Sequence, residues 1–595
     1  MSLAAITVLS QSSGQAVAAP VRSVSSHVAA VNDAAVNDAA VNVAAVNVAA
    51  VNDAAVSDAA VNDAFDRVRW GDDAADKTAR DQHGRNKADA DAGSLYTVEN
   101  AIGARSVWQQ RDSASRQITG QGVTVALLDS GVAGVSGLDG AGKLSLGPDL
   151  SIESNGVLID QDTYGHGTHL AGIIAGRDEA VLTDKTIAGL NPAVQLGVAP
   201  DAGLLSMKLA TTDGSTDVSQ VIAALNWITE HQTNYDGSRV RVINLSFGTS
   251  SVQPYQLDPL AAAAENAWRH GLVVVVSGGN EGAAAGRLTN PAIDPYVIAV
   301  GASDSKNSVA GWNRPSVASF SSGGTAQRHV DLLAPGSSIV SLRAPGSFID
   351  ANHPEGLVDG DTTGRLFRGS GTSQAAAVVS GAVALLLQAY PDLTPDQVKA
   401  ALVATASRVP ASAVYAGAGQ LDVAAALSAL RLASRSKSAT GLERVPAQDF
   451  PPSTGQGSLD EARGGDSLLD ADGVALTGEV DVQGNPWDAA AWWAASSELT
   501  SWVGGDWMGA TWTGSGWASE TDDLKSARWS SARWSSARWS SARWSSARWS
   551  SARWSDAEWS SARWSSARWS SARWSDADWS SARWSSARRS DATWG

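Results

Sequence analysis

Three short segments carry side chains that together could activate a serine hydroxyl as a nucleophile. In the first, Asp129 follows an almost unbroken apolar run, residues 123–128. In the second, His166 lies between two glycines in Gly-His-Gly-Thr-His, and in the third Ser373 ends the sequence Gly-Ser-Gly-Thr-Ser. A serine hydroxyl is a poor nucleophile at neutral pH unless a base accepts its proton, and a histidine oriented by a carboxylate is such a base.

Each of these residues also has an ordinary structural explanation. Asp129 could be a turn residue, His166 a packed polar residue, and Ser373 an N-cap, which is the commonest role of serine before a helix. Taken singly, these explanations are at least as good as a catalytic one. Their occurrence together, in one order along one pattern of elements, favours catalysis.

The elements that must position these residues alternate between strands and helices. Apolar, β-branched runs predict buried strands at 123–128, 240–245, 272–276 and 297–300. Helical patterns over 216–228 and 260–268 lie between them, and further helices are predicted at 394–406 and 421–433. We therefore expect an α/β fold with a mostly parallel buried sheet and helices on both faces.

This architecture gives each of the three residues a defined place. Asp129 would lie at the carboxyl end of a strand, where open α/β sheets gather their functional groups. His166 and Ser373 precede small apolar runs, 170–176 and 375–387, that read as buried helices. The main-chain N–H of Ser373 would then have no partner inside its helix, and it could donate to a developing oxyanion.

The three segments resemble the three signatures of the subtilase family of serine peptidases, in the chain order Asp, His, Ser that is already described for subtilisin. Two further segments extend the resemblance. Residues 244–248, Asn-Leu-Ser-Phe-Gly, are similar to the segment that lines the substrate cleft, and residues 277–280, Ser-Gly-Gly-Asn, to the one that holds the oxyanion asparagine. The resemblance covers residues 94–433, so that region is the expected subtilisin-like peptidase domain.

The resemblance implies a serine endopeptidase that acts on polypeptides through an acyl-enzyme, as a monomeric domain with no required cofactor. It implies that Ser373 is the nucleophile, His166 the general base and Asp129 the group that orients His166. Asn280 would donate to the oxyanion. The implied substrate-binding residues are Ser246, Phe247 and Gly248, which would pair with an extended peptide, and Gly278 and Gly279, which would border the first specificity pocket.

Metal ligands are less well supported. His166 and His169 are three residues apart, but no glutamate follows His166 as in H-E-x-x-H, so we expect no catalytic metal. Asp160 and Asp162 lie in an acidic loop that could bind structural calcium, as many subtilases do, although no EF-hand spacing is present.

The N-terminal region has low complexity. Residues 1–22 are expected to be an atypical secretory signal, or one whose start lies upstream of Met1, since Ala16-Val17-Ala18 fits a cleavage site but no Lys or Arg precedes it. We therefore expect a secreted or cell-envelope protein without a membrane span. Residues 23–93 form an Ala-Ala-Val-Asn-Asp repeat and a polar linker, too polar for the inhibitory prodomain of many subtilases.

The C-terminal region is expected to be a linker, 434–486, followed by a Trp/Arg pentad-repeat tail, 487–595. A flexible extension is the simplest interpretation of the tail, and a β-solenoid with five residues per face is the alternative. Repeated tryptophan and arginine could bind a cell-surface polymer through many weak contacts. The net charge of −17 is unevenly distributed, with a basic tail, and predicts no nucleic-acid binding.

Two other functions stay open at this point. The subtilase-like domain could be an inactive binding module, against which the complete set of Asp129, His166, Ser373 and Asn280 argues. Alternatively, the enzyme could process itself, and its main product would be the released adhesive tail.

Overall fold

The structure of the chain is a computed structural model. Residues 1–90, which include the expected signal segment and most of the polar linker, lie outside the described residues. The structure describes residues 91–511, apart from 152, 154–157, 179–193, 234–238, 359, 436–444 and 465–478, together with four three-residue strands of the tail.

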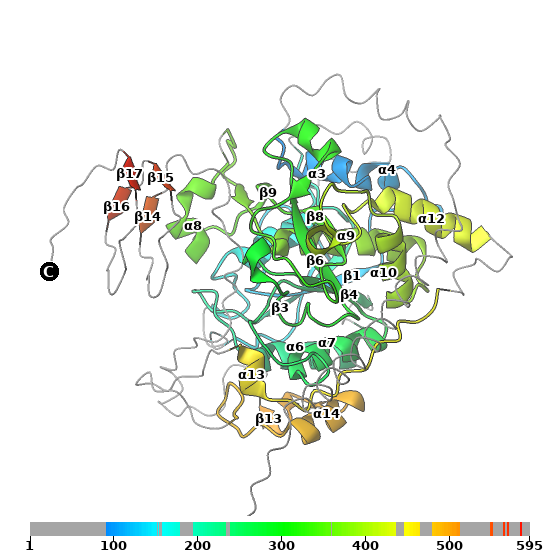
Figure 1. Cartoon of the computed structure of the whole chain (residues 1–595), viewed down its shortest axis with the longest axis vertical. Helices are drawn as coiled ribbons and strands as arrows, with labels where there is room; N and C mark the ends of the chain where they lie inside the picture. Colours follow the sequence, from blue (N-terminus) through cyan, green and yellow to red (C-terminus); the bar gives the residue numbers. More distant parts are fainter. Residues whose placement is uncertain are drawn as a thin grey trace, which may run out of the picture. The chain divides into compact units, whose positions relative to one another are not determined.

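The domain alternates strands with helices as the sequence predicts (Figure 1). Its strands are β1 (Thr124–Asp129), β2 (Leu144–Leu146), β3 (Gly203–Lys208), β4 (Val240–Leu245), β5 (Val273–Ser277), β6 (Ile298–Asp304), β7 (Ser316–Val317), β8 (Leu332–Pro335), β9 (Ile339–Leu342) and β10 (Leu366–Gly369). Its helices are α3 (Leu95–Ala101), α4 (Ala104–Trp108), α5 (His166–Ala175), α6 (Val218–Glu230), α7 (Pro259–Arg269), α8 (Phe348–Asn352), α9 (Thr372–Ala389), α10 (Pro395–Ala404), α11 (Ala413–Ala416) and α12 (Val423–Arg435), with 3-10 turns at Ala283–Ala285, Val309–Asn313 and Pro354–Gly356.

The central sheet is mostly parallel, which confirms the predicted fold class. Its strand order is β2-β3-β1-β4-β5-β6-β7, with β8 also paired to β6, and among these pairs β6–β7 is antiparallel. Strand β5 is buried along its whole length, as expected for a β-branched strand with helices on both faces. The order reverses at β1, because β3 lies on one side of it and β4 on the other. Such a switch point opens a crevice at the carboxyl ends of the strands.

Helices cover both faces of this sheet (Figure 1). Helices α5 and α9 pack against each other and against the strands, while α6 packs against α7 and both contact strands of the sheet. Helix α9 is the described helix with the length and hydropathy of a membrane span, and it is almost entirely buried inside the domain. It is therefore the central core helix, and its first turn holds Ser373.

The chain beyond the predicted peptidase domain continues to fold against it (Figure 1). Helix α13 (Leu459–Arg463) contacts α6 and α7, and helix α14 (Ala489–Ser497) contacts α7. A small antiparallel meander follows, formed by β11 (Trp502–Val503), β12 (Asp506–Trp507) and β13 (Ala510–Thr511). The structure differs here from the expected linker and tail, because the described parts of 445–511 bury apolar side chains such as Leu459 and Trp492 against the domain.

Four short strands are described in the tail. β14 (Arg548–Ser550) pairs in parallel with β16 (Arg568–Ser570), and β15 (Arg563–Ser565) pairs in parallel with β17 (Arg583–Ser585). Each pair joins residues separated by four pentads, as from Trp549 to Trp569. This pairing suits the β-solenoid alternative, but the other pentads lie outside the described residues, so the order of the tail stays a prediction.

Candidate active site

Asp129 lies at the carboxyl end of β1, at the switch point of the sheet. Its side chain is buried, and the main-chain N–H of Ser130 donates to Oδ1 at 2.8 Å. The strand ends here because Ser130 and Gly131 turn away, with Gly131 in a left-handed conformation (φ 103°). A carboxylate is thereby held at the edge of the sheet where the crevice opens.

His166 is the first residue of α5, and it faces that carboxylate. Its Nδ1 donates to Asp129, at 2.8 Å from Oδ1 and 2.9 Å from Oδ2. The close approach requires glycine at position 167, since a Cβ there would lie 2.0 Å from the carbonyl oxygen of Gly131 and 3.2 Å from Asp129 Oδ1. The Gly-His-Gly sequence therefore lets the first turn of α5 pack closely against the end of β1.

Ser373 is the second residue of α9, after Gly371 and Thr372. Because it lies in the first turn, its main-chain N–H has no acceptor within the helix. Its hydroxyl is buried and has no hydrogen-bond partner among the described residues. Helices α5 and α9 pack together, so the histidine and the serine occupy the first turns of two neighbouring helices.

Asn280 follows β5, and its side chain is hydrogen-bonded to the first residue of α9. Its Oδ1 accepts hydrogen bonds from the main-chain N–H of Thr372 at 2.8 Å and from the Thr372 hydroxyl at 3.0 Å. These two bonds fix the amide orientation. The Nδ2 group is buried and has no acceptor within the described part of the chain, so a donor is left at the start of α9.

The predicted substrate-binding residues lie at the same edge of the sheet. Ser246, Phe247 and Gly248 follow β4, and the Ser246 hydroxyl donates to the Ser373 carbonyl oxygen at 3.4 Å. The Phe247 side chain is fully buried, so only its main chain could meet a peptide. Gly278 and Gly279 follow β5, and Gly279 has a φ of 109° that disfavours any residue with a Cβ.

The second histidine of the motif is not equivalent to the first. Burial, followed by the charge of His166, lowers the pKa of His169 to about 3. Its Nε2 lies 3.2 Å from the carbonyl oxygen of Phe367. His169 is therefore neutral near pH 7 and serves to join α5 to β10.

The sequence alone did not connect Ser130 and Asp162 with this site. The Ser130 hydroxyl lies 3.2 Å from Asp129 Oδ1 and donates to Asp162 Oδ1 at 2.7 Å. Asp162 also accepts a hydrogen bond from the main-chain N–H of Gly165 at 2.7 Å. It accepts another from the main-chain N–H of Thr168, the third residue of α5, at 2.8 Å. An aspartate just before Gly-His-Gly-Thr could have signalled this role, because such a residue commonly satisfies the first N–H groups of a helix.

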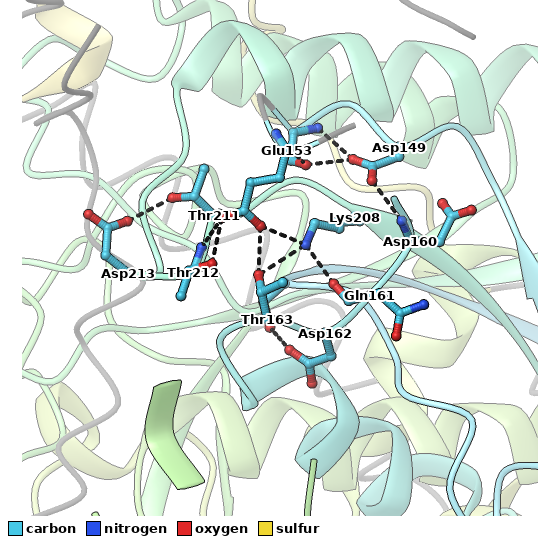
Figure 2. A network of polar contacts seen from close by, with 12 residues as sticks. Asp149, Glu153, Asp160, Gln161, Asp162, Thr163, Lys208, Thr211, Thr212 and Asp213 are labelled. Carbon is cyan, nitrogen blue, oxygen red and sulfur yellow. Dashed lines mark hydrogen bonds and ion pairs between the residues drawn. The ribbon is translucent and has the colours of Figure 1, made fainter. Parts of the chain in front are cut away.

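Calcium does not suit Asp162, because protein donors already occupy both of its carboxylate oxygens. An ammonium group holds the neighbouring loop instead, as Figure 2 shows. Lys208 Nζ donates to Glu153 Oε2 at 3.0 Å, to the carbonyl oxygen of Gln161 at 2.5 Å and to Thr163 Oγ1 at 3.0 Å. No cluster of three or more side chains suited to a metal ion occurs among the described residues, and calcium binding stays a prediction.

Comparison with known proteins identifies the family of the chain. The family model described as "Subtilase family" matches residues 120–432, more than half of the chain. The chain belongs to the subtilase family. Among curated relatives of this subtilase, serine protease AprX of Bacillus subtilis (strain 168) is 34% identical over 311 residues, which are 51% of this chain and 65% of AprX. The match thus spans slightly less than two thirds of AprX.

Other relatives match the subtilase over more of their own length. Subtilisin DY of Bacillus licheniformis is 31% identical over 314 residues, which cover 52% of this chain and 91% of that protein. Subtilisin E of Bacillus subtilis (strain 168) is 33% identical over 321 residues, covering 52% and 67%. The crystal structure of a cold adapted subtilisin-like serine proteinase covers 55% of this chain and 98% of its own, with 27% identity and a TM-score of 0.39.

The family match ends at residue 432, before the C-terminal segment that packs on α6 and α7. Residues 445–511 are therefore an addition to the matched subtilase core. One of their contacts with the core follows directly after the predicted substrate-binding segment 246–248, where Thr249 Oγ1 donates to the carbonyl oxygen of Ala462 at 2.6 Å.

Proposed function

We propose that this subtilase is a serine endopeptidase that cleaves polypeptides through an acyl-enzyme on Ser373. The observation that carries the proposal is the pair of hydrogen bonds from His166 Nδ1 to Asp129 at the switch point of the sheet. The location of Ser373 in the first turn of α9, which packs on the helix that begins with His166, supports its role as the nucleophile.

The roles follow from the chemistry of the groups. His166 Nε2 takes the hydroxyl proton as Ser373 Oγ bonds to the peptide carbonyl carbon, and then gives that proton to the leaving amine. The same imidazole activates water to hydrolyse the acyl-enzyme. Asp129 holds Nδ1–H, so it fixes the tautomer and stabilises the imidazolium.

The negative charge that develops on the carbonyl oxygen would be bound by two donors. One is Asn280 Nδ2, whose amide is oriented by Thr372, and the other is the main-chain N–H of Ser373. The positive end of the α9 dipole acts in the same direction. Because these donors are held in place before the reaction, they need little reorganisation in the transition state.

The substrate would bind as an extended strand. The main chain of Ser246–Gly248 lies at the carboxyl edge and is proposed to pair with the peptide residues before the scissile bond. Gly278 and Gly279 are proposed to border the pocket for the adjacent side chain. Since nothing in this arrangement identifies one side chain, a peptide-library cleavage profile is the experiment that defines the preference.

An active-site label tests the proposal directly. A fluorophosphonate probe should label the wild-type chain at residue 373 and should not label Ser373→Ala. Ser370→Ala is the matched control, because its hydroxyl accepts a hydrogen bond from the Ser338 N–H and has no proposed catalytic role, so it should still be labelled. A folded wild-type chain without label would instead support the inactive binding module.

The remaining predictions concern the regions outside the peptidase. Mass mapping of fragments from wild type and Ser373→Ala tests self-processing, which requires cleavage products that are absent from the variant. Two proposals rest on the sequence: that the protein is exported, and that its Trp/Arg tail binds a cell-surface polymer. A pull-down of the tail with isolated cell walls tests the latter.

A further inference from the structure

Asp162 is a second buried carboxylate beside the proposed triad, and it has no part in the mechanism above. The following inference rests on the proposed function. Asp162 lies on the loop before α5, and its side chain points toward the start of that helix (Figure 2). Four donors from three residues reach its two oxygens: Ser130 Oγ, Gly165 N, Thr168 N and Thr168 Oγ1.

These contacts tie Asp162 to both sides of His166. Gly165 immediately precedes the histidine, and Thr168 follows it by two residues. On the same side, the main-chain N–H of Gly167 donates to Ser130 Oγ at 3.0 Å. The first turn of α5 is therefore fastened to the end of β1 through Asp162 and Ser130, and the imidazole ring is carried on that turn.

Ser130 links the two carboxylates through a single proton. Its oxygen lies 2.7 Å from Asp162 Oδ1 and 3.2 Å from Asp129 Oδ1. One hydroxyl proton can serve only one of these acceptors, and the shorter contact is the stronger hydrogen bond. The proton therefore points to Asp162, which leaves His166 as the side-chain donor closest to the Asp129 carboxylate.

We propose that Asp162 is a positioning residue of the triad, which draws the Ser130 proton away from Asp129 and fixes the first turn of α5. Asp129 consequently keeps its full capacity to stabilise the imidazolium of His166. A third hydrogen bond from Ser130 would spread the Asp129 charge and weaken that stabilisation.

Other charged groups around the site do not take over this function. Lys208 is engaged by Glu153, Gln161 and Thr163, on the side of the loop away from α5 (Figure 2). Asp213 accepts the Thr211 hydroxyl. Neither residue donates to Asp129 or to the first turn of α5 in any contact described above, so Asp162 and Ser130 form the link.

The test is a comparison of Asp162→Asn, Ser130→Ala and the double variant with wild type. Asparagine cannot accept all four donors, so the Ser130 hydroxyl is released to donate to Asp129. We expect Asp162→Asn to lower kcat about 10-fold with a smaller change in KM, because the loss is in orientation. We also expect the acidic limb of the kcat/KM–pH profile to move to lower pH.

The Ser130→Ala variant shows which of the two carboxylates accepts the serine proton. If the serine proton points to Asp162, its removal takes no donor from Asp129, and the acidic limb stays in place. In the double variant the hydroxyl that would turn to Asp129 is absent, so the limb should move less than in Asp162→Asn alone. This non-additivity is the signature of a coupled pair.

Thr168→Val is the matched control for structure. It removes another hydroxyl donor from the same carboxylate, and an acceptor for the Ala133 N–H, without touching the link to Asp129. It should lower the melting temperature but leave the acidic limb unchanged.

The outcomes separate this inference from the proposed function. A wild-type chain without peptidase activity or label contradicts the proposed function itself. If the wild type is active, an acidic limb that Asp162→Asn leaves unmoved overturns the inference, and so does a shift of that limb to higher pH in Ser130→Ala, which would place the proton on Asp129.

Discussion

Arg463 and Asp217 form an ion pair that is buried beneath the C-terminal segment. Arg463 Nε donates to Asp217 Oδ1 at 2.8 Å, and the side chains are 1% and 0% exposed. Asp217 is also the N-cap of α6, where it accepts the main-chain N–H of Ser219. The pair therefore joins α13, beyond the matched family region, to the start of a helix of the peptidase core.

Arg463→Met should destabilise the domain by roughly 3–5 kcal/mol, because it leaves the buried Asp217 charge without its partner. Chemical denaturation followed by tryptophan fluorescence measures this change. The matched control is Arg177→Met, which removes the pair with Asp201 between side chains that are 36% and 22% exposed, and should cost no more than about 1 kcal/mol. Equal losses in the two variants would contradict the buried-pair explanation.

The same pair predicts a dependence of stability on pH. Burial raises the pKa of Asp217, but the charge and hydrogen bonds of Arg463, with those of Ser219, outweigh it, so the pKa lies below its ordinary value. The contribution to stability is thus complete above the ordinary carboxyl pKa and lost as the pH falls toward the lower folded value. The free energy of unfolding of Arg463→Met should accordingly fall less steeply than that of wild type as the pH is lowered.

Gly167→Ala should disrupt the proposed triad. The added Cβ would lie 2.0 Å from the Gly131 carbonyl oxygen, so α5 must move away from β1 and carry His166 with it. A misplacement of this kind lowers turnover by about 10²-fold. Gly134→Ala is the matched control, since no atom lies within 4 Å of its added Cβ, and its kcat should equal that of wild type.

Asn280→Ala should lower kcat by roughly 10²–10³-fold with little change in KM, because it removes a donor that acts mainly in the transition state. Asn226→Ala removes a buried asparagine on α6, which accepts the indole N–H of Trp492, and it should reduce stability while kcat is retained. Steady-state kinetics on one peptide substrate compares the two. An unchanged kcat in Asn280→Ala would remove this residue from the oxyanion site.

Asp294→Asn should stabilise the domain more at pH 8 than at pH 5. Burial, followed by the charge of Glu265, raises the pKa of Asp294 to about 8. The folded state then holds a proton that the unfolded chain releases, so this group's contribution to stability is complete below its ordinary pKa and is lost as the pH rises through about 8. Because each pKa unit corresponds to about 1.4 kcal/mol, the gain in the variant should be several kcal/mol larger at pH 8 than at pH 5, measured by denaturation at both pH values.

Much of the fold could be predicted from local patterns. The run before Asp129 is the buried strand β1, and the helix expected to begin after Thr394 is α10, which Thr394 and Gln397 cap reciprocally. The proline at position 395 occupies the first helical turn, where its missing N–H costs nothing. These features depend on neighbours within a few residues, so the sequence displays them directly.

The C-terminal segment could not be predicted in the same way. Its composition of Ser, Gly, Asp and Pro is that of a linker, and its contacts are distant in sequence, as between Trp492 and Asn226. Trp502 and Trp507, which the sequence analysis assigned to the repeat tail, are cross-strand partners in a tight meander. No local periodicity encodes such pairing.

The sequence motifs pointed to Asp129 and His166 but not to the residues that hold them in place. Asp129 and His166 are hydrogen-bonded as the motifs suggest, while Ser130 and Asp162 could not be assigned from residue type alone. A carboxylate in an acidic loop reads equally well as a calcium ligand. Only the donors around Asp162 distinguish the two, and they come from three separate positions along the chain.

The buried attachment of α13 and the following meander has a consequence for the order of synthesis. Ser373 leaves the ribosome well before Arg463 and Trp507, so a nascent chain holds every proposed catalytic residue while Asp217 and the outer sides of α6 and α7 are still uncovered. The domain gains the contacts of α13, α14 and the meander only after translation has passed these segments. Late completion of this kind delays the appearance of a durable peptidase until most of the polypeptide has been made.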